Sequence, residues 1–411
     1  MTSDMKRFFL ALLFLALFGA AAELNCINTS QGALLFDGEY ASVSFGEYEK
    51  AYPLADFGMY KAKTAEGWTV LDGQGVRIGD AYQKIGACEA GIIVMKDQKY
   101  QLLGADLVPV NKKQYMLITP LSSGALALKG QSWDSIPDRV YYLDRDGQEY
   151  MRDIRLIFTG EEQEGLLPAC DGETGLWGYI GEDAVWAIAP SFASAGGFVN
   201  GIAPASALSG MGVINRNGEW LLHPLFTDVR LNERLILCRE LGALYVYRRD
   251  ENGLILISAF ERAEGELTGE YYIVRAEGET EIYDSYGTLM MNCEGEGLIY
   301  PGLPSQLVFR AEEGYRAVDI ETMEASKTYG AIRANEEYGA YLCGDLNDGA
   351  MRYGLMDEGF REILPVVYDS VSVNKDGIAA ALKADGLEVY ALAGDHAPVL
   401  LTTINKTDTE E

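Results

Sequence analysis

Only two histidines occur among the 411 residues, so the sequence offers few places for histidine-based catalysis. His223 lies directly before a proline, and comparable stretches of the chain carry Ala189 and Leu364 before theirs. A position that accepts His, Ala and Leu is expected to have a structural role. His396, in the stretch AGDHAPV, is expected to lie in a turn, and no nucleophile elbow accompanies either histidine. We therefore predict no catalytic residue.

Two short acidic stretches resemble the beginning of calcium-binding loops. They are DRDG, from Asp144 to Gly147, and DLNDG, from Asp345 to Gly349. A complete loop needs further carboxylates and a bidentate glutamate at fixed spacing, which neither stretch has. DRDG is better interpreted as a hairpin turn, because Asp, Asn and Gly tolerate positive φ. We predict no metal site and no cofactor, and weak calcium binding at the acidic surface stays an alternative.

The charge of the chain is strongly acidic. Asp and Glu number 62 against 33 Lys and Arg, which gives a formal net charge of −29. Such a surface repels phosphate backbones and anionic headgroups, so we predict no nucleic-acid partner. Glycoside hydrolases use paired carboxylates, but among 62 acidic residues a pair can be chosen at will, so no pair is a specific signal.

The elements that position these residues form a repeat. Short apolar runs, most of them following a glycine, recur ten times with a mean spacing of about 35 residues. They begin at Gly58, Gly91, Gly124, Gly165, Gly201, Arg234, Glu270, Ser305, Gly339 and Gly377.

A second series of hairpins alternates with these runs. In each copy an aromatic-led strand meets a turn of Asp, Asn and Gly, and another apolar strand follows, as in WTVLDGQGVRI and MGVINRNGEWLL. The sequence therefore predicts an all-β tandem repeat of about ten units with three to four short strands each. We expect a propeller-like ring rather than an open β-solenoid, because closure removes exposed sheet edges.

Three stretches share a more specific pattern of residues. Each has a large residue followed by glycine, a proline twelve or thirteen residues after that large residue, and an aromatic side chain shortly after the proline. The residues that define the pattern are Trp177, Gly178, Tyr179, Pro190, Phe192 and Gly201, then Met211, Gly212, Pro224 and Phe226, and finally Tyr353, Gly354, Pro365 and Tyr368.

These stretches resemble the WG-repeat family. The resemblance implies a β-repeat fold, and members are typically bacterial, often exported and mostly without an assigned activity, so no catalytic residue is carried over. We expect Trp177 to serve packing, Gly178 to allow close approach of strands, and the proline to end its strand. The following aromatic is expected to fill the core between units.

The six cysteines show no CxxC or CxC spacing, so metal clusters are not indicated. Cys170, Cys238 and Cys343 occupy the same strand in units that are not adjacent, so we expect buried thiols there rather than disulfides. The pairing of Cys26, Cys88 and Cys293 stays open.

The N-terminus predicts export. Residues 1–22 combine Lys6 and Arg7, the apolar stretch FFLALLFLALF and small residues before a cut after Ala22. We interpret them as a cleaved signal peptide rather than an uncleaved anchor, since the apolar stretch is too short to span a membrane. The repeat domain is expected over residues 23–401, and residues 402–411 are expected to form a polar, flexible tail.

The sequence favours an exported, non-enzymatic β-repeat protein that acts as a binding or scaffolding surface, secreted or at the cell envelope. Its partner would be a protein, a peptide or a glycan. Two alternatives stay open: a hydrolase of an envelope polymer that uses paired carboxylates, and a purely structural module for protein interaction.

Overall fold

The computed structural model describes residues 24–37, 42–54, 57–130, 139–251, 253–294, 299–311, 313–392 and 397–405. These residues form β-strands and turns and contain no helix. None of them forms a helix that is long and apolar enough to cross a membrane. The predicted signal peptide, residues 1–22, lies outside the described residues.

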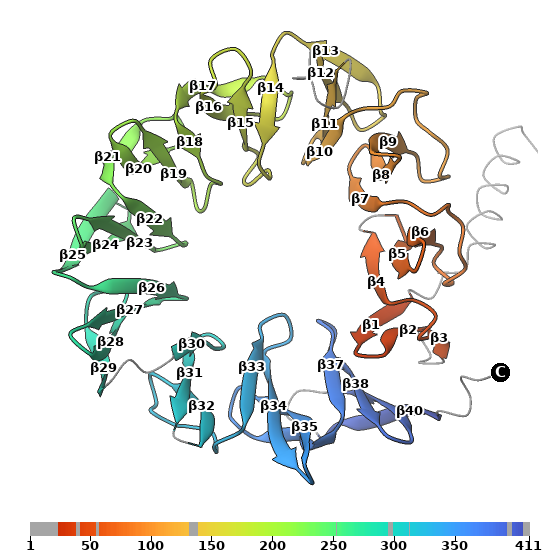
Figure 1. Ribbon diagram of the computed structural model, residues 1–411, viewed down its shortest axis with the longest axis vertical. Helices are drawn as coiled ribbons and strands as arrows, with labels where there is room; N and C mark the ends of the chain where they lie inside the picture. The colour runs from red at the N-terminus through yellow and green to blue at the C-terminus, as the bar shows by residue number, and fades with distance from the viewer. Residues whose placement is uncertain are drawn as a thin grey trace, which may run out of the picture. The chain divides into compact units, whose positions relative to one another are not determined.

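The first twenty strands are short and follow one another along the chain (Figure 1). They are β1 (Asn25–Thr29), β2 (Gly32–Phe36), β3 (Ser42–Phe45), β4 (Lys50–Leu54), β5 (Met59–Thr64), β6 (Gly67–Leu71), β7 (Lys84–Cys88), β8 (Gly91–Lys96), β9 (Lys99–Leu103), β10 (Leu117–Leu121), β11 (Gly124–Lys129), β12 (Arg139–Leu143), β13 (Glu149–Arg152), β14 (Leu156–Thr159), β15 (Leu167–Asp171), β16 (Trp177–Ile180), β17 (Trp186–Phe192), β18 (Ser194–Ala195), β19 (Ile202–Ala207) and β20 (Gly210–Asn215).

The remaining strands continue the same pattern. They are β21 (Trp220–Phe226), β22 (Asp228–Leu231), β23 (Leu235–Glu240), β24 (Ala243–Asp250), β25 (Gly253–Phe260), β26 (Glu264–Thr268), β27 (Tyr271–Ala276), β28 (Glu279–Asp284), β29 (Leu289–Glu294), β30 (Ile299–Pro301), β31 (Gln306–Ala311), β32 (Gly314–Asp319), β33 (Ala331–Asn335), β34 (Ala340–Asn347), β35 (Ala350–Asp357), β36 (Glu362–Tyr368), β37 (Ser370–Val373), β38 (Ile378–Lys383), β39 (Gly386–Ala391) and β40 (Val399–Asn405).

The strands form small sheets in which neighbours in space are also neighbours in the chain. In the described residues these are eleven sheets, with the orders β1-β2-β3, β4-β5-β6, β7-β8-β9, β10-β11-β12-β13, β14-β15-β16-β17, β18-β19-β20-β21, β22-β23-β24-β25, β26-β27-β28-β29, β30-β31-β32, β33-β34-β35-β36 and β37-β38-β39-β40. The predicted all-β architecture of three- to four-stranded units is confirmed. About ten units were expected, and the sheet without a predicted counterpart is β1-β2-β3.

The turn that follows the third strand of a sheet is closed by one recurring side chain. Asp72, Asp144, Asn215 and Asp284 each accept two backbone N–H groups, two and four residues further on, at 2.8–3.0 Å. A short polar side chain thus replaces part of the backbone turn, which is why Asp and Asn recur there. The interpretation of DRDG as a turn is confirmed, because Asp144 is one of these residues.

DLNDG is also a turn. It spans the end of β34 and the start of β35, and Asp348 and Gly349 in it have φ of 52° and 79°. The Oδ1 atom of Asp345 accepts the backbone N–H of Gly330 at 2.7 Å. Asp345 therefore contributes to the local fold of the sheet.

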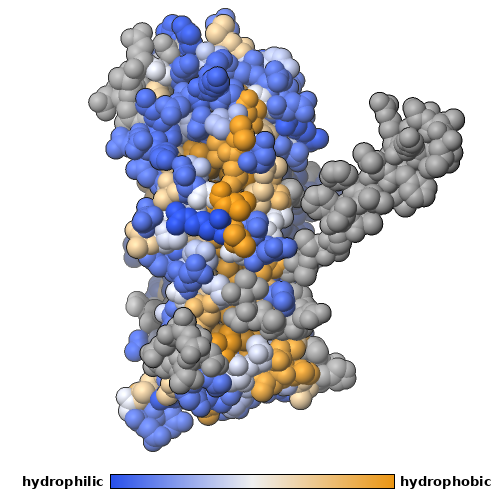
Figure 2. All heavy atoms as spheres, turned by 90° about the vertical axis from the view of Figure 1, so that its right-hand side faces the viewer, coloured by the Kyte–Doolittle hydropathy of each residue, from blue (hydrophilic) through white to orange (hydrophobic). Residues whose placement is uncertain are grey.

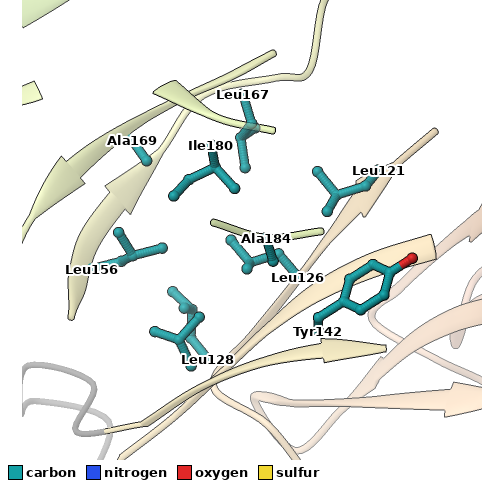
Figure 3. Packing of buried hydrophobic residues seen from close by; sticks show 10 residues of the cluster. Leu121, Leu126, Leu128, Tyr142, Leu156, Leu167, Ala169, Ile180 and Ala184 are labelled. Carbon is teal, nitrogen blue, oxygen red and sulfur yellow. The ribbon is translucent and has the colours of Figure 1, made fainter. Parts of the chain in front are cut away.

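The chain divides into two compact units. Unit 1 comprises residues 1–85, 350–354 and 363–411, and unit 2 comprises residues 86–349 and 355–362. In unit 2 the sheets pack face to face, and Figure 3 shows one such core. Leu121, Leu126 and Leu128 there meet Leu156 and Ile180 of the following sheet. Because one small sheet cannot bury its own apolar face, the repeat is stabilised by its neighbours.

Loops between the first and second strands also join neighbouring sheets of unit 2. The side-chain amide of Asn200 donates to the carbonyl of Glu233 at 3.1 Å, and that of Asn232 donates to the carbonyl of Gly269 at 2.8 Å. Each loop therefore binds the equivalent loop of the next sheet. This contact repeats with the period of the chain.

In unit 1 the first and last sheets share a core. Ile27, Leu34 and Phe36 of β1 and β2 pack with Ile378 and Leu382 of β38. The hydroxyls of Ser30 and Ser370 lie 2.8 Å apart and join the same two sheets. Residues far apart in the sequence thus form one packed interface.

The described C-terminal residues belong to the last sheet. Thr402 to Asn405, which we expected in the tail, form the end of β40, since they pair with β39 from Gly386 to Val389. Residues 406–411 lie outside the described part of the chain.

On the face drawn in Figure 2, hydrophilic residues prevail and hydrophobic residues form a narrow strip.

Candidate ligand-binding cavity

The glycine of the repeat pattern lies beneath the fourth strand of its sheet. A Cβ atom on Gly178 would lie 2.5 Å from the carbonyl oxygen of Ile188, and one on Gly212 would lie 2.3 Å from that of Leu222. At Gly354 the carbonyl oxygen of Leu364 would be 2.4 Å away. These distances leave no room for a side chain, so the close strand approach predicted for Gly178 is present in all three copies.

A bulge in the fourth strand produces this close approach. Trp177 pairs with Phe192 and Tyr179 with Ile188, so three residues of β17 lie opposite the single residue Gly178. The same irregularity separates the Met211–Phe226 and Val213–Leu222 pairs of β20 and β21. The extra residues need space above the strand, and the absent side chain provides it.

The proline lies within this bulge, and the expectation that it ends the strand is wrong. β17 continues for two residues past Pro190, and β21 continues for two residues past Pro224. In the third copy Pro365 lies inside β36, which continues to Tyr368. Proline is tolerated there because the fourth strand is an edge strand and the bulge leaves N–H groups outside the ladder.

The bulge also corrects the alignment of His223. Leu364 lies ten residues after Gly354, as Ile188 follows Gly178 and Leu222 follows Gly212, so His223 corresponds to Pro365 rather than to Leu364. His223 is exposed in β21. His396 lies outside the described residues.

The aromatic residue after the bulge packs against the next sheet, as predicted. The ring centroids of Phe192 and Trp220 lie 5.5 Å apart in an edge-on arrangement, and those of Phe226 and Tyr245 lie 6.1 Å apart. The ring centroids of Tyr368 and Tyr390 lie 6.5 Å apart. These rings join consecutive sheets through apolar contact.

Trp177 and Tyr179 serve the same core with different burial. Tyr179 is fully buried, contacts Phe198 at 4.8 Å and donates its hydroxyl to the carbonyl of Gly196 at 2.8 Å. Trp177 is only half-buried at the margin of this core. Met211 is half-buried against the core of the next sheet pair, and Tyr353 is half-buried as well.

Gly201 has its own role at the loop before β19. Its φ of 77° favours glycine, and its N–H donates to Oε2 of Glu164 at 2.9 Å. The guanidinium of Arg216 binds the same carboxylate at 3.0 Å. Glu164 thereby joins two sheets of unit 2.

The described cysteines are free thiols. Cys170, Cys238 and Cys343 are buried at the fourth position of β15, β23 and β34, which confirms the predicted buried thiols. Burial raises the pKa of Cys238 and of Cys343 to about 12, so neither is a thiolate near neutral pH. Cys26 and Cys88 are free and half-buried, and the side chain of Cys293 lies outside the described part.

A cavity of about 220 Å³ lies between the first and last sheets of unit 1. Its polar lining combines the amides of Gln31 and Asn405, the carboxylate of Asp369 and the ammonium group of Lys383, and Phe45 adds an aromatic ring. β3, β38 and β40 carry three of these residues, so packed strands position the lining. The sequence analysis named none of them, because their juxtaposition depends on contact between the two ends of the chain.

Both charged groups of the lining are neutralised by neighbours. Asp369 forms an ion pair with Arg352. Lys383 donates to Oε1 of Glu388 at 2.8 Å and lies 5.0 Å above the ring of Tyr368. The lining can therefore form directional hydrogen bonds without exposing an unpaired charge.

Glu388 is the centre of a hydrogen-bond network beside the cavity. Its Oε2 accepts the hydroxyls of Tyr390 at 2.7 Å and Tyr368 at 3.1 Å. Burial would raise the pKa of Glu388, but the hydrogen bonds from Lys383, Tyr390 and Tyr368 outweigh it and hold that pKa below its usual value.

The partners of Glu388 are shifted in the opposite sense. The hydrogen bond to Glu388 raises the pKa of Lys383, and burial raises that of Tyr390. Each group therefore stays in its resting protonation state near neutral pH. Such a network positions side chains, and none of its members is poised to transfer a proton.

The described residues contain no group of three or more His, Cys, Asp or Glu side chains that could hold a metal ion. The acidic residues are instead dispersed over turns and ion pairs. Arg216–Glu164 at 3.0 Å and Arg234–Glu270 at 2.9 Å are examples of such pairs.

Sheets of three or four strands with a repeated glycine and bulge define an all-β repeat protein. Three segments of the chain, residues 177–206, 211–233 and 353–386, match the family described as WG containing repeat. These three segments are thus WG repeats, as the residues around Trp177, Met211 and Tyr353 predicted.

Solved structures resemble the chain only distantly. A crystal structure of the eukaryotic initiation factor has a TM-score of 0.41 and 11% identity, covering 93% of this chain and 96% of that chain. Apo AztD from Citrobacter koseri has a TM-score of 0.31 and 13% identity over 69% of this chain and 92% of its own. Saccharomyces cerevisiae Sqt1 has a TM-score of 0.30 and 11% identity over 61% and 86%. Among curated protein sequences no match is found.

Proposed function

We propose that the protein is an exported, non-enzymatic β-repeat protein that binds a peptide or glycan through the cavity of unit 1. The cavity of about 220 Å³ carries this proposal. It is smaller than the roughly 300–1,000 Å³ of pockets for drug-sized ligands, so its size suits a single sugar ring or amino-acid side chain. Gln31 and Asn405 offer donors and acceptors, and Phe45 offers an apolar face.

The electrostatics of the cavity favour binding over catalysis. Asp369 and Glu388 are both engaged by cationic partners, and the pKa of Glu388 is lowered rather than raised. A general acid in a glycosidase needs the opposite shift. A hydrolase is therefore the weaker proposal for this cavity.

We further propose that the sheets close into a propeller-like ring rather than an open β-solenoid. The core that Ile27, Leu34 and Phe36 share with Ile378 and Leu382 supports this arrangement, since the first and last sheets cover one another there. Small-angle scattering tests it. Eleven sheets stacked about 10 Å apart would give an open array about 100 Å long. A clearly shorter maximum dimension supports the ring, and one near that length excludes it.

The binding proposal is tested by screening the purified protein against glycan and peptide libraries, followed by calorimetric titration of the hits. We expect Gln31→Ala and Phe45→Ala to weaken binding of a cavity ligand. Gln74→Ala is the matched control, because Gln74 is an exposed glutamine of unit 1 outside the lining.

Three outcomes would overturn the proposal. They are the absence of any hit, hits whose affinity neither cavity variant changes, and hydrolysis of the bound glycan or peptide. The salt dependence of the affinity distinguishes a cavity ligand from a partner bound to the acidic surface. The affinity of a surface-bound partner should fall steeply as the ionic strength rises, whereas that of a cavity ligand should not.

A further inference from the structure

A second, larger cavity of unit 1 adjoins the cavity described above. Its volume is about 560 Å³, within the roughly 300–1,000 Å³ of small-molecule pockets. It is lined by the hairpin turn between β1 and β2, by residues 46–50 at the start of β4, and by the turn between β5 and β6. Gln31, in the first of these turns, lines both cavities. The two cavities therefore meet at one side chain.

The first sheet lies between the two cavities. Leu34 and Leu35 are consecutive in β2, and they pack in opposite directions, Leu34 with the last sheet and Leu35 with the sheet β4-β5-β6. The other walls of the first cavity come from the last sheet, and those of the second come from β4-β5-β6. A ligand that occupies both cavities thus passes over the turn that carries Gln31.

The turns that line the second cavity use their own backbone groups. The hydroxyl of Thr29 donates to the carbonyl of Gly32 at 2.7 Å and accepts the N–H of Gln31 at 3.2 Å. Thr64 forms the equivalent two bonds in the turn between β5 and β6, at 3.0 and 3.2 Å. An extended peptide binds through the free backbone groups of a strand edge, which these turns do not provide. The second cavity therefore recognises its ligand through side chains.

The side chains that line the second cavity are polar, apart from Ala65 and the buried Tyr48. They offer hydroxyl, amide, carboxylate and ammonium groups. The exposed side-chain amide of Gln31 has no hydrogen-bond partner within the described residues. Such a lining can donate to and accept from a ligand rich in hydroxyl groups. An apolar ligand would desolvate these groups without replacing their hydrogen bonds.

The charges of the second cavity disfavour an acidic ligand. Glu47 and Glu49 line it together with one cation, Lys50. The ion pairs found within the described residues include none of these three. The excess carboxylate repels carboxylate and sulfate groups of a ligand. In the first cavity the charges of Asp369 and Lys383 are already paired with neighbours.

We infer that the two cavities together bind one uncharged oligosaccharide, with a sugar ring in each cavity. One ring packs its C–H face against Phe45, and the next ring lies beyond Gln31 and bonds the polar groups of the second cavity. The amide of Gln31 can donate to one ring and accept from the other. The inference rests on the proposed function of the first cavity, and it adds the class of the ligand and a minimum length of a disaccharide.

Calorimetric titration of the purified protein with uncharged mono-, di- and trisaccharides of glucose, galactose, mannose and N-acetylglucosamine tests the inference. We expect a disaccharide to bind about tenfold more tightly than its monosaccharide, because the second ring adds hydrogen bonds. Ala65→Trp, which fills the second cavity, and Lys50→Ala, which removes a donor, should reduce this advantage to about threefold or less. Lys375→Ala is the matched control, because Lys375 is exposed in unit 1 and lines neither cavity.

The outcomes distinguish this inference from the proposed function. Equal affinities for monosaccharide and disaccharide, or an advantage that Ala65→Trp leaves intact, would overturn the inference while binding in the first cavity stands. Binding of acidic glycans or peptides alone would overturn the class of ligand. The absence of any binding would overturn both proposals. Circular dichroism spectra identical to wild type show that the variants are folded.

Discussion

The neighbouring sheets β18–β21 and β22–β25 have the same strand order but different chemistry at one position. In the first, Gly212 lies opposite Ala205, and three residues of β21 lie opposite this glycine. In the second, Tyr245 takes the corresponding place opposite Cys238 and pairs regularly with Ala259. A side chain at this position requires a regular fourth strand, and its absence permits the bulge.

The same difference determines the edge of each sheet. The bulge of β21 places Pro224 where an incoming strand would need an N–H group, so this edge is protected. β25 pairs with β24 along its length except for one bulge, and its sequence GLILISAF contains no proline. The glycine of the WG pattern therefore affects both the interior of a sheet and its exposed edge.

The largest effect is expected when Gly212 receives a side chain. Gly212→Ala places a Cβ about 2.3 Å from the carbonyl oxygen of Leu222, which is backbone and has little freedom to move. We expect a loss of about 3 kcal/mol in the free energy of unfolding, measured by urea denaturation. Gly86→Ala is the control, since a Cβ there meets nothing within 4 Å and should change the stability by less than about 0.5 kcal/mol. Equal losses in both variants would contradict this interpretation.

A smaller effect is expected at the first residue of the pattern. Replacing a fully buried tryptophan with alanine costs about 3–5 kcal/mol. Because Trp177 is half-buried, we expect about 2 kcal/mol in urea denaturation. Phe192→Ala, which empties a buried position of the same core, should cost more. The reverse order would show that Trp177 contributes through contacts other than this core.

The smallest effect is expected from the hydrogen bond that Glu388 accepts from Tyr368, the aromatic residue after the third bulge. Phe226 makes ring contacts only, whereas Tyr368 also donates to Glu388. Because the pKa of Glu388 is lowered in the folded state, its stabilisation is present above the usual value of 4.5 and is lost as the pH falls through the folded-state pKa. We expect the melting temperature of the wild type to fall more between pH 5 and pH 3 than that of Glu388→Gln. Parallel curves for the two proteins would exclude this network as a source of stability.

Much of the architecture was predictable from the sequence because it is encoded locally. The Asp and Asn side chains of the third hairpin, such as Asp144 and Asn215, act within four residues of their own position. The glycine at or before most second strands marks the period in the same way. The first sheet was missed although GALLF in β2 is also an apolar run led by a glycine.

The cavity could not be predicted for a different reason. Gln31 and Asn405 are brought together by packing between the first and last sheets, and no local pattern carries that contact. The position of Pro224 inside the strand could not be predicted from the sequence either. A proline in a bulge and a proline that ends a strand have the same sequence pattern, and only the strand register distinguishes them.

The most direct test of the relation between glycine and bulge is a double-mutant cycle in the sheet β18–β21. It compares the free energies of unfolding of the wild type, Gly212→Ala, a variant that lacks His223 and Pro224, and the variant with both changes. Removing two residues leaves one residue opposite position 212, as in a regular pair. If the bulge requires the glycine, the combined variant should be more stable than Gly212→Ala alone, with a coupling of about 2 kcal/mol. Additive losses would contradict this account.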